Sequence, residues 1–338
     1  MDQPIIGQVW AAQANFYRVM TREYGELLCT ARARLKKTGQ WVLVGDRVVV
    51  EEVDVAGQRG AIGEILPRRT VLDQPPLANV DQLLLVLALA EPPLEPQVLS
   101  RFLVKAEGTG LPFLLVLNKV DRCSPVQVAV WQEKLASWGY QPLLISTATG
   151  QGLEQLTPHL VNHLTVLTGP SGVGKSSLIN RLVPGARLAT GAVAAKTGRG
   201  RHTTRNVQLL PLPQGGMLAD TPGFQQPTLE MEPARLPLCF PEIRRQGVTC
   251  EFSDCSHRDE PGCALAKDWE RYEHYLQWRQ ELEVLAAQKQ AQGRSDVGVK
   301  YKPAEQGGYR AEPKLAPHKY RAISRRRWHQ DLLTVEDE

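Results

Sequence analysis

The segment GPSGVGKSS at residues 169–177 constrains the fold of this chain more than any other feature. It satisfies the pattern G-x-x-x-x-G-K-[ST]. It also follows the apolar run LTVLTG and opens a helical stretch, which is the context that this pattern requires. In such a loop, backbone N–H groups turn inward around phosphate oxygens, Lys175 brings positive charge to the β- and γ-phosphates, and the Ser176 hydroxyl binds Mg²⁺. The residues expected to bind phosphate are Gly169, Pro170, Ser171, Gly172, Val173, Gly174, Lys175, Ser176 and Ser177.

A second phosphate-side element, DTPG at 220–223, follows the apolar run GGMLA. We expect Asp220 to hold Mg²⁺ through water, and the Gly223 N–H to face the γ-phosphate. Upstream, the segment GRGRHTTRNV at 198–207 has no periodic pattern and predicts a mobile loop. A threonine in such a loop can reach Mg²⁺ when GTP is bound and release it after hydrolysis. Thr203 and Thr204 are both candidates, and the residues alone do not decide between them.

Two residues are candidates for a catalytic role. The first is Lys175, because its charge lies where negative charge develops on the phosphates. Ras-like proteins place a glutamine after D-x-x-G to orient the attacking water, whereas this chain has Phe224, which has no polar atom for that task. His202 is the nearest polar alternative and the second candidate. That His202 has no special role, and that Gln225 acts instead, both stay open.

The tetrad NKVD at 118–121 follows the apolar run FLLVL and predicts recognition of guanine. The Asp121 carboxylate can accept hydrogen bonds from N1–H and N2–H of guanine, donors that adenine does not offer. We expect Asn118 to contact the other edge of the base and the Lys119 stem to pack along the ring. In ISTATG, at 145–150, the Ser146–Thr147 backbone can present an N–H to guanine O6. Together with the phosphate loop, these residues predict that the chain binds GTP and GDP rather than ATP.

Strand-like and helical patterns alternate from 72 to 230, which predicts a parallel α/β sheet with helices on both faces. Residues 1–71 instead contain short alternating runs broken by glycines, which predict a five-stranded OB-type β-barrel. Such barrels often bind nucleic acid through cations and aromatic platforms. The candidates in the barrel are Arg32, Arg34, Lys36, Lys37, Phe16, Tyr17 and Trp41. An ordinary solvated barrel surface is the alternative interpretation.

Three of the six cysteines gather with a histidine in CEFSDCSHRDEPGC, at 250–263. No export signal is visible, so a reducing compartment is expected, which favours metal binding over disulfides. Cys250, Cys255, His257 and Cys263 have the ligand types of a closed, structural Zn²⁺ site without an open coordination position. A metal would stabilise a segment too short to bury its own core. We therefore expect a small helical zinc-binding domain over 231–292.

The formal net charge is only +4, but positive charge is concentrated near the end of the chain. Between Arg294 and Arg327 there are ten Lys/Arg and three Asp/Glu. This composition predicts a basic, flexible tail over 293–338, which either binds RNA or is simply solvated. The longest apolar run, LLLVLALA at 83–90, is far shorter than a membrane span. A cytoplasmic protein without membrane contact is expected.

The motifs occur in an unusual order: NKVD, STATG, GPSGVGKS, HTT and then DTPG. This order, between an N-terminal barrel and a Cys₃His segment, resembles the ribosome small-subunit-dependent GTPase A family, whose members are circularly permuted GTPases. The resemblance covers about residues 1–290. It implies a multidomain protein that hydrolyses GTP to GDP slowly alone and faster with the small (30S) ribosomal subunit. It further implies that the protein helps late maturation of that subunit, contacts ribosomal RNA through the barrel, and docks through the zinc domain. We expect a monomer.

At the level of single residues, His202 matches the histidine in the switch loop of that family. The chain departs from the family at Ser146–Thr147, where Ser-Ala is common, and a backbone contact tolerates this change. Gly172 stands where potassium-stimulated relatives have asparagine, so potassium dependence is not expected. A GTP-binding, RNA-associated regulator not tied to the small subunit is the alternative function. A nucleic-acid-binding module with a decayed nucleotide site is disfavoured by intact Lys175, Ser176 and Asp220.

Overall fold

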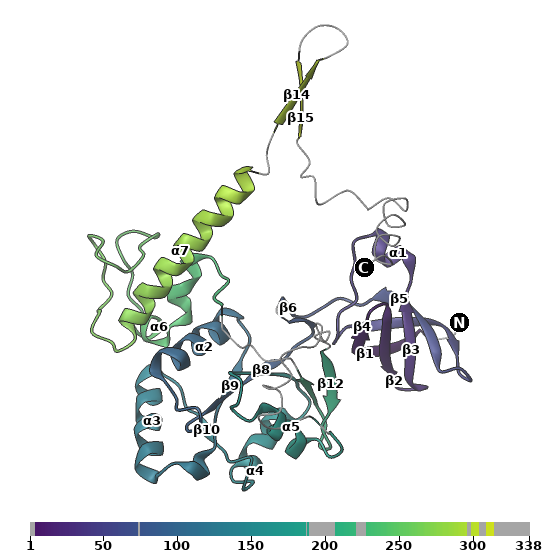
Figure 1. The fold of residues 1–338 in the computed structure, drawn as a ribbon, viewed down its shortest axis with the longest axis horizontal. Helices are drawn as coiled ribbons and strands as arrows, with labels where there is room; N and C mark the ends of the chain where they lie inside the picture. Colours follow the sequence, from purple (N-terminus) through teal and green to yellow (C-terminus); the bar gives the residue numbers. More distant parts are fainter. Residues whose placement is uncertain are drawn as a thin grey trace, which may run out of the picture. The chain divides into compact units, whose positions relative to one another are not determined.

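The computed structural model describes residues 4–73, 75–186, 188, 207–220, 228–295, 299–303 and 309–313. The chain falls into two compact units, Met1–Tyr275 and Leu276–Glu338. Figure 1 shows the elements of both units along the sequence. None of the helices within these described ranges is both long and apolar enough to cross a membrane.

The first unit begins with a closed β-barrel (purple in Figure 1). Its strands are β1 (Ile5–Gln13), β2 (Phe16–Thr21), β3 (Gly25–Ala31), β4 (Arg47–Asp54) and β5 (Arg59–Ile65), with the short helix α1 (Ala33–Lys37) between β3 and β4. The strand order is β1-β2-β3-β5-β4, and β4 pairs back onto β1. Alternate residues such as Val9, Val19 and Leu27 point into the barrel and form its core. The predicted five-stranded OB-type barrel is therefore confirmed.

The second sheet region contains the phosphate and base motifs. Its strands lie in the order β10-β9-β8-β11-β13-β12. They are β8 (Gln82–Ala88), β9 (Phe113–Asn118), β10 (Leu143–Leu144), β11 (Leu164–Thr168), β12 (Gln208–Pro211) and β13 (Met217–Asp220). All are parallel except β12, which runs antiparallel to β13. Every residue of β8 is buried, as expected for a central strand covered on both faces.

Helices cover the two faces of this sheet and divide its apolar residues into two cores. One core contains Leu83, Leu85 and Leu87 of β8 and is covered by α2 (Pro96–Gly108) and α3 (Pro125–Trp138). The other contains Leu84 and Val86 and is covered mainly by α5 (Lys175–Leu182). Because side chains alternate along a strand, one apolar run supplies both cores.

The helical stretch that follows β10 is divided into two short helices. It consists of α4 (Leu153–Leu156) followed by the 3₁₀ helix η2 (Thr157–Leu160). Pro158 has no N–H to donate, so it cannot continue the α-helical hydrogen-bond ladder.

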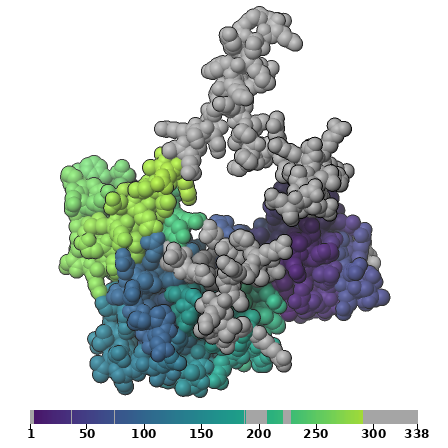
Figure 2. All heavy atoms as spheres, viewed as in Figure 1, coloured from purple at the N-terminus to yellow at the C-terminus, as the bar shows by residue number. Residues whose placement is uncertain are grey.

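The barrel and the α/β sheet are joined within the first unit. β1 pairs antiparallel with β12 through Ala11 and Gln208, and Val44 forms a bridge with Leu77. Leu77 lies in a hairpin made by β6 (Val71–Asp73) and β7 (Pro76–Ala78), which follows the barrel. In the space-filling view the purple atoms of the barrel accordingly adjoin those of the α/β sheet (Figure 2).

After Asp220 the described chain resumes at residue 228 and enters η4 (Pro233–Cys239) and α6 (Pro241–Gln246). The Cys/His segment follows, and then α7 (Tyr272–Ser295), which belongs mostly to the second unit. We expected a flexible tail after residue 292. The structure has there two paired strands, β14 (Val299–Pro303) and β15 (Tyr309–Pro313). Valine and tyrosine in these strands favour extended backbone, which composition alone did not reveal.

Candidate functional site

The base and phosphate motifs meet at one edge of the α/β sheet. β9 ends at Asn118, β11 ends at Thr168 directly before the phosphate loop, and β13 ends at Asp220. The ISTATG segment continues from β10. Since these four strands are parallel, their carboxyl ends lie at the same edge, where α/β proteins bind their ligands.

The buried Asn118 amide connects three of these loops. Its Nδ2 donates to the Val173 carbonyl oxygen of the phosphate loop at 2.7 Å and to Thr147 Oγ1 at 3.3 Å. Its Oδ1 accepts from the Thr147 N–H at 3.0 Å. Asn118 therefore holds the base-reading and phosphate loops in a fixed arrangement, while its predicted contact with the base stays a prediction.

Lys119 of the NKVD tetrad contacts a loop around Glu91 that the sequence motifs did not indicate. Lys119 has a left-handed backbone conformation (φ 63°), and its Nζ donates to the Glu91 carbonyl oxygen. The Glu91 carboxylate pairs with Arg122, while Asp121 is exposed in the 3₁₀ helix η1 (Val120–Arg122). Burial lowers the pKa of Lys119, and nearby Asp121 opposes this shift. The sequence did contain an indication of this contact. Glu91 directly follows the apolar run LLLVLALA, so it lies at the same carboxyl edge of the sheet as the NKVD tetrad.

The backbone of the ISTATG segment is already largely hydrogen-bonded. The Ser146 N–H donates to the Gln151 carbonyl oxygen at 3.0 Å, and the Thr147 N–H goes to Asn118. Arg181 of α5 donates to the carbonyl oxygens of Thr147 at 3.1 Å and Ala148 at 2.7 Å. These bonds fix the segment but occupy both N–H groups that the sequence suggested for guanine O6. The exposed Ala148, next along the chain, is the better candidate donor.

Two glycines of the phosphate loop are required by space as well as conformation. A Cβ on Gly169 (φ +137°) would lie 2.0 Å from the Val86 carbonyl oxygen. A Cβ on Gly174 (φ +100°) would lie 2.3 Å from Asn118 Nδ2. Gly174 also precedes α5, so the loop leads directly into the N-terminus of that helix, a favourable position for phosphate.

Lys175 and Asp220 are half-buried charges near one another. The Lys175 ammonium donates to the carbonyl oxygens of Gly169 at 2.7 Å and Pro170 at 2.6 Å. Burial lowers the pKa of Lys175 to about 8, and Asp220 partly opposes this shift. Burial likewise raises the pKa of Asp220, and Lys175 opposes it. Lys175 thus directs its ammonium donors to the carbonyl groups of its own loop.

The remaining predicted residues divide into two sets. Ser176 and Ser177 lie half-buried in the first turn of α5, directly after Lys175. Four others lie outside the described residues: His202, Thr203, Thr204 and Gly223. The roles of both sets stay predictions.

Cys250, Cys255, His257 and Cys263 converge at a second site. Their ligand atoms all lie within 4.8 Å of one another. The three Sγ atoms lie 3.5, 3.8 and 3.9 Å from His257 Nδ1. A tetrahedral Zn²⁺ with Zn–S of about 2.3 Å and Zn–N of about 2.0 Å places its sulfur and nitrogen ligands about 3.5 Å apart. The four side chains therefore fit a structural zinc ion.

Neighbouring side chains fix the loop that carries these ligands. The Glu260 carboxylate accepts from the N–H groups of Ser256 at 3.0 Å and Arg258 at 2.8 Å, and from the Ser256 hydroxyl. The Ser256 hydroxyl is the main cause that lowers the pKa of Glu260 to about 2. From α7, the Tyr272 hydroxyl donates to the His257 carbonyl oxygen at 3.0 Å, and the Tyr275 hydroxyl donates to that of Ser256 at 2.6 Å.

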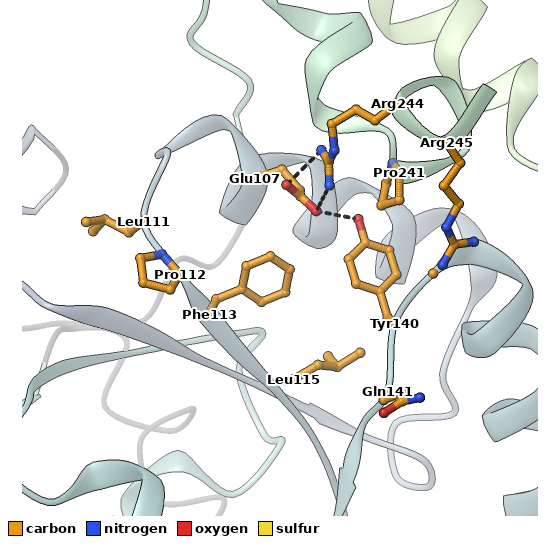
Figure 3. A pocket seen from close by; sticks show the side chains of 11 residues that line it. Glu107, Leu111, Pro112, Phe113, Leu115, Tyr140, Gln141, Pro241, Arg244 and Arg245 are labelled. Carbon is orange, nitrogen blue, oxygen red and sulfur yellow. Dashed lines mark hydrogen bonds and ion pairs between the residues drawn. The ribbon is translucent and has the colours of Figure 1, made fainter. Parts of the chain in front are cut away.

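A separate cavity of about 640 Å³ lies beside the amino-terminal half of β9 (Figure 3). Phe113 and Tyr140 line it, and Glu107 accepts hydrogen bonds from Tyr140 and Arg244 at its rim. Because Asn118 and the phosphate loop lie at the opposite, carboxyl ends of the strands, this cavity is not the nucleotide site.

Comparison with known proteins identifies the family. Residues 65–230 match the profile described as RsgA GTPase. A relative from Nostoc sp., named small ribosomal subunit biogenesis GTPase RsgA 1, is 50% identical over 99% of this chain and 97% of its own length. This chain belongs to the RsgA GTPase family. A second family member, from Microcystis aeruginosa, is 50% identical over 98% of this chain and 94% of its own length.

Solved structures agree with this membership in the RsgA GTPase family. YjeQ from Thermotoga maritima superimposes with a TM-score of 0.69 at 33% identity, covering 83% of this chain and 99% of that one. YloQ, described as a circularly permuted GTPase, gives 0.68 at 30% identity, with 83% and 96% covered. The predicted permuted GTPase fold and GTP hydrolase activity are confirmed. The boundaries predicted near 71, 230 and 292 stay predictions.

Proposed function

We propose that this GTPase is a late assembly factor of the small (30S) ribosomal subunit, which binds ribosomal RNA and hydrolyses GTP faster when bound to the subunit. The observation that carries the proposal is 50% identity, over nearly the whole chain, to a relative named for biogenesis of that subunit. The site described above supports it, because the base-reading and phosphate loops meet around Asn118.

In this proposal the chain's own residues bind and orient GTP. Asp121 accepts the guanine N1–H and N2–H, and the Ala148 N–H donates to O6. The N–H groups of residues 169–177 surround the phosphates, and Lys175 exchanges its two carbonyl partners for phosphate oxygens. Ser176 and Asp220 hold Mg²⁺, which supplies positive charge to the phosphate oxygens when it is bound.

The catalytic assignments in the switch segment are part of the same proposal. His202 orients the attacking water, because Phe224 occupies the position that bears glutamine in Ras-like proteins. Thr203 or Thr204 contacts Mg²⁺ in the GTP state. His202→Ala is therefore expected to lower subunit-stimulated turnover and leave GTP affinity unchanged. An unchanged stimulated rate would remove His202 from the mechanism.

The zinc ion, cellular location and oligomeric state complete the proposal. One Zn²⁺, held by the Cys₃His set, has a structural role, since four protein ligands leave no open position for chemistry. The protein acts in the cytoplasm as a monomer, where its partners are the small subunit, ribosomal RNA, GTP and GDP.

The deciding experiment measures GTP turnover by the full chain alone, with purified small subunits and with purified large subunits. Stimulation by small subunits only is the expected result. If neither small nor large subunits stimulate turnover, the result would favour an RNA-associated regulator not tied to the small subunit. Absence of any turnover, despite GTP binding, would argue against catalysis by this site.

A further inference from the structure

Ion pairs neutralise two of the four barrel cations that the sequence suggested for RNA binding, Arg32 and Arg34. Arg34 donates to the Glu51 carboxylate at 2.7 Å and to the Gly63 carbonyl oxygen. Arg32 pairs with Glu51 at 3.6 Å and with Glu52. On the outer face of β2 and β3, Arg18 likewise forms a two-point pair with Glu26. These guanidinium groups are therefore poorly placed to contact phosphate.

A different part of the barrel combines an exposed aromatic ring with a cavity. Trp41, in the loop between α1 and β4, is 66% exposed, compared with 51% for Phe16 on β2. The cavity beside it has a volume of about 480 Å³. Its walls come from this loop, from the end of β5 and from the segment that follows β5, and include Gln40, Leu43, Ile65, Pro67 and Arg68.

The backbone that carries Trp41 is held firmly. Arg68 donates to both carboxylate oxygens of the fully buried Asp46, at 2.7 and 2.9 Å, and also to the Trp41 carbonyl oxygen. Asp46 in turn accepts from the Leu43 N–H at 2.7 Å. An exposed ring on such a fixed backbone loses little conformational freedom when a flat partner stacks on it.

Local charge favours an anionic partner. Residues 32–45 contain four Lys/Arg and no Asp/Glu. Arg32 and Arg34 are paired with acidic residues of β4, whereas Lys37 lies exposed at the end of α1, four residues before Trp41. An aromatic platform beside a cation is the combination with which proteins bind unpaired bases of RNA.

We propose that the Trp41 site, defined as Trp41 with the adjoining cavity and Lys37, binds an unstacked base of single-stranded RNA. The base stacks on the Trp41 ring over the cavity, and Lys37 contacts the neighbouring phosphate. This inference rests on the proposed function, since it names the RNA-binding surface of the same assembly factor. It assigns the contact to the α1–β4 loop rather than to the outer face of β2 and β3.

The test compares Trp41→Ala, Trp41→Phe and Phe16→Ala in the full chain. Affinity is measured for a fluorescent single-stranded oligoribonucleotide, for a protein-free fragment of small-subunit RNA and for intact small subunits. Stacking of one base predicts that Trp41→Ala weakens all three by about tenfold, that Trp41→Phe recovers most of the loss, and that Phe16→Ala stays within about twofold. Thermal unfolding confirms that each variant is folded, and basal GTP turnover should be unchanged.

Three outcomes would overturn the inference. In the first, Trp41→Ala binds all three ligands like the wild type. In the second, Phe16→Ala is the weakened variant. In the third, Trp41→Ala loses affinity for subunits but not for protein-free RNA, so the partner of Trp41 is a protein. The oligonucleotide measurement also separates the two proposals. If the wild type binds oligonucleotide through Trp41 but does not bind small subunits, the proposed function fails and the RNA site stands.

Discussion

At the scale of single residues, the nucleotide site depends on atoms that connect loops as much as on atoms that touch the ligand. Asn118 is the main example. In the sequence it is part of a base-reading tetrad, but in the structure its amide bonds to Val173 and Thr147, in two other loops. Because both groups would lose a partner if Asn118 were removed, the geometry of the phosphate loop and of guanine recognition are linked.

Two glycines of the phosphate loop form a matched pair for testing this packing. Gly172 (φ +80°) and Gly174 (φ +100°) both have left-handed backbones, so alanine is strained at either position by about 1–2 kcal/mol. At Gly172 the nearest atom to a new Cβ is 3.9 Å away, but at Gly174 it would be Asn118 Nδ2 at 2.3 Å. In urea unfolding, Gly174→Ala should lose clearly more stability than Gly172→Ala. Equal losses would show that the Asn118 contact is unimportant.

Guanine selectivity should depend on the exposed Asp121 carboxylate. Asp121→Asn replaces an acceptor of two guanine N–H groups with an amide, which suits xanthine better. Hydrogen bonds to charged groups contribute about 1.5–3 kcal/mol, so GDP affinity should fall by about 10- to 150-fold. Xanthosine diphosphate affinity should rise, as measured by calorimetry. Asp73→Asn, at an exposed position outside the NKVD tetrad, is the control, and unchanged GDP preference in Asp121→Asn would contradict the assignment.

Nucleotide affinity should depend on pH through Lys175. Its pKa is about 8 in the free protein, and bound phosphate raises this pKa because it favours the charged ammonium. Below pH 8 the free protein already carries the proton, so Lys175 adds no pH dependence. Above pH 8 binding requires proton uptake, and affinity for GDP should fall by up to about tenfold per pH unit. Calorimetry in buffers of different ionisation enthalpy measures this uptake, and its absence at pH 9 would contradict the prediction.

At the scale of elements, the zinc loop is organised by groups that are not ligands. The Glu260 carboxylate accepts hydrogen bonds from backbone N–H groups on both sides of His257. Two tyrosines at the start of α7 donate hydrogen bonds to the carbonyl oxygens of Ser256 and His257. His257 itself has a positive φ of 56°, which this loop must maintain. Hydrogen bonds of this kind, made by residues that do not bind the metal themselves, orient metal ligands and raise metal affinity.

Replacing Glu260 should therefore weaken zinc binding without removing a ligand. Glu260→Gln is expected to lower Zn²⁺ affinity by about 10- to 100-fold, measured by competition with a chromogenic chelator. The wild type should contain about one zinc per chain by elemental analysis, as one four-ligand site requires. Asp254→Asn, an exposed change between the first two cysteines, should leave affinity unchanged. Equal affinities for Glu260→Gln and Asp254→Asn would exclude a positioning role for Glu260.

At the scale of the whole molecule, the permuted chain order determines which segment follows β13, the strand that ends at Asp220. The chain leaves Asp220, and the described part resumes at 228 before η4, α6 and the zinc ligands. Just before α7, the buried Arg271 pairs with Glu242 of α6 and donates to Ser100 of α2. Its guanidinium also lies 4.9 Å from the ring centres of Trp138 and Phe240. This single side chain thus connects the zinc-bearing segment to two helices of the GTPase sheet.

Breaking this ion pair should destabilise the protein strongly. Arg271→Met leaves the Glu242 carboxylate buried without its partner, which costs about 3–5 kcal/mol in denaturant unfolding. The double variant Glu242→Gln with Arg271→Met should recover part of the loss, because no buried charge is left alone. Lys267→Met breaks the exposed pair with Asp259 and should cost far less stability, because solvent screens an exposed ion pair. Similar losses for Arg271→Met and Lys267→Met would contradict the connecting role of Arg271.

The architecture and the motifs of the site could be predicted from the sequence. Local patterns are enough for this, since alternation and apolar periodicity define the barrel and the parallel sheet, and ligand types at fixed spacing define the phosphate, guanine and zinc motifs. The folded structure was needed to show which polar atoms already have hydrogen-bond or ion-pair partners within the protein. In it, the N–H groups of Ser146 and Thr147 have partners within the protein, and Lys119 contacts Glu91. Arg32 and Arg34 pair with acidic residues, which leaves Trp41 as the better candidate for contact with RNA. These assignments depend on which distant loops and strands meet in space, and sequence spacing does not contain that information.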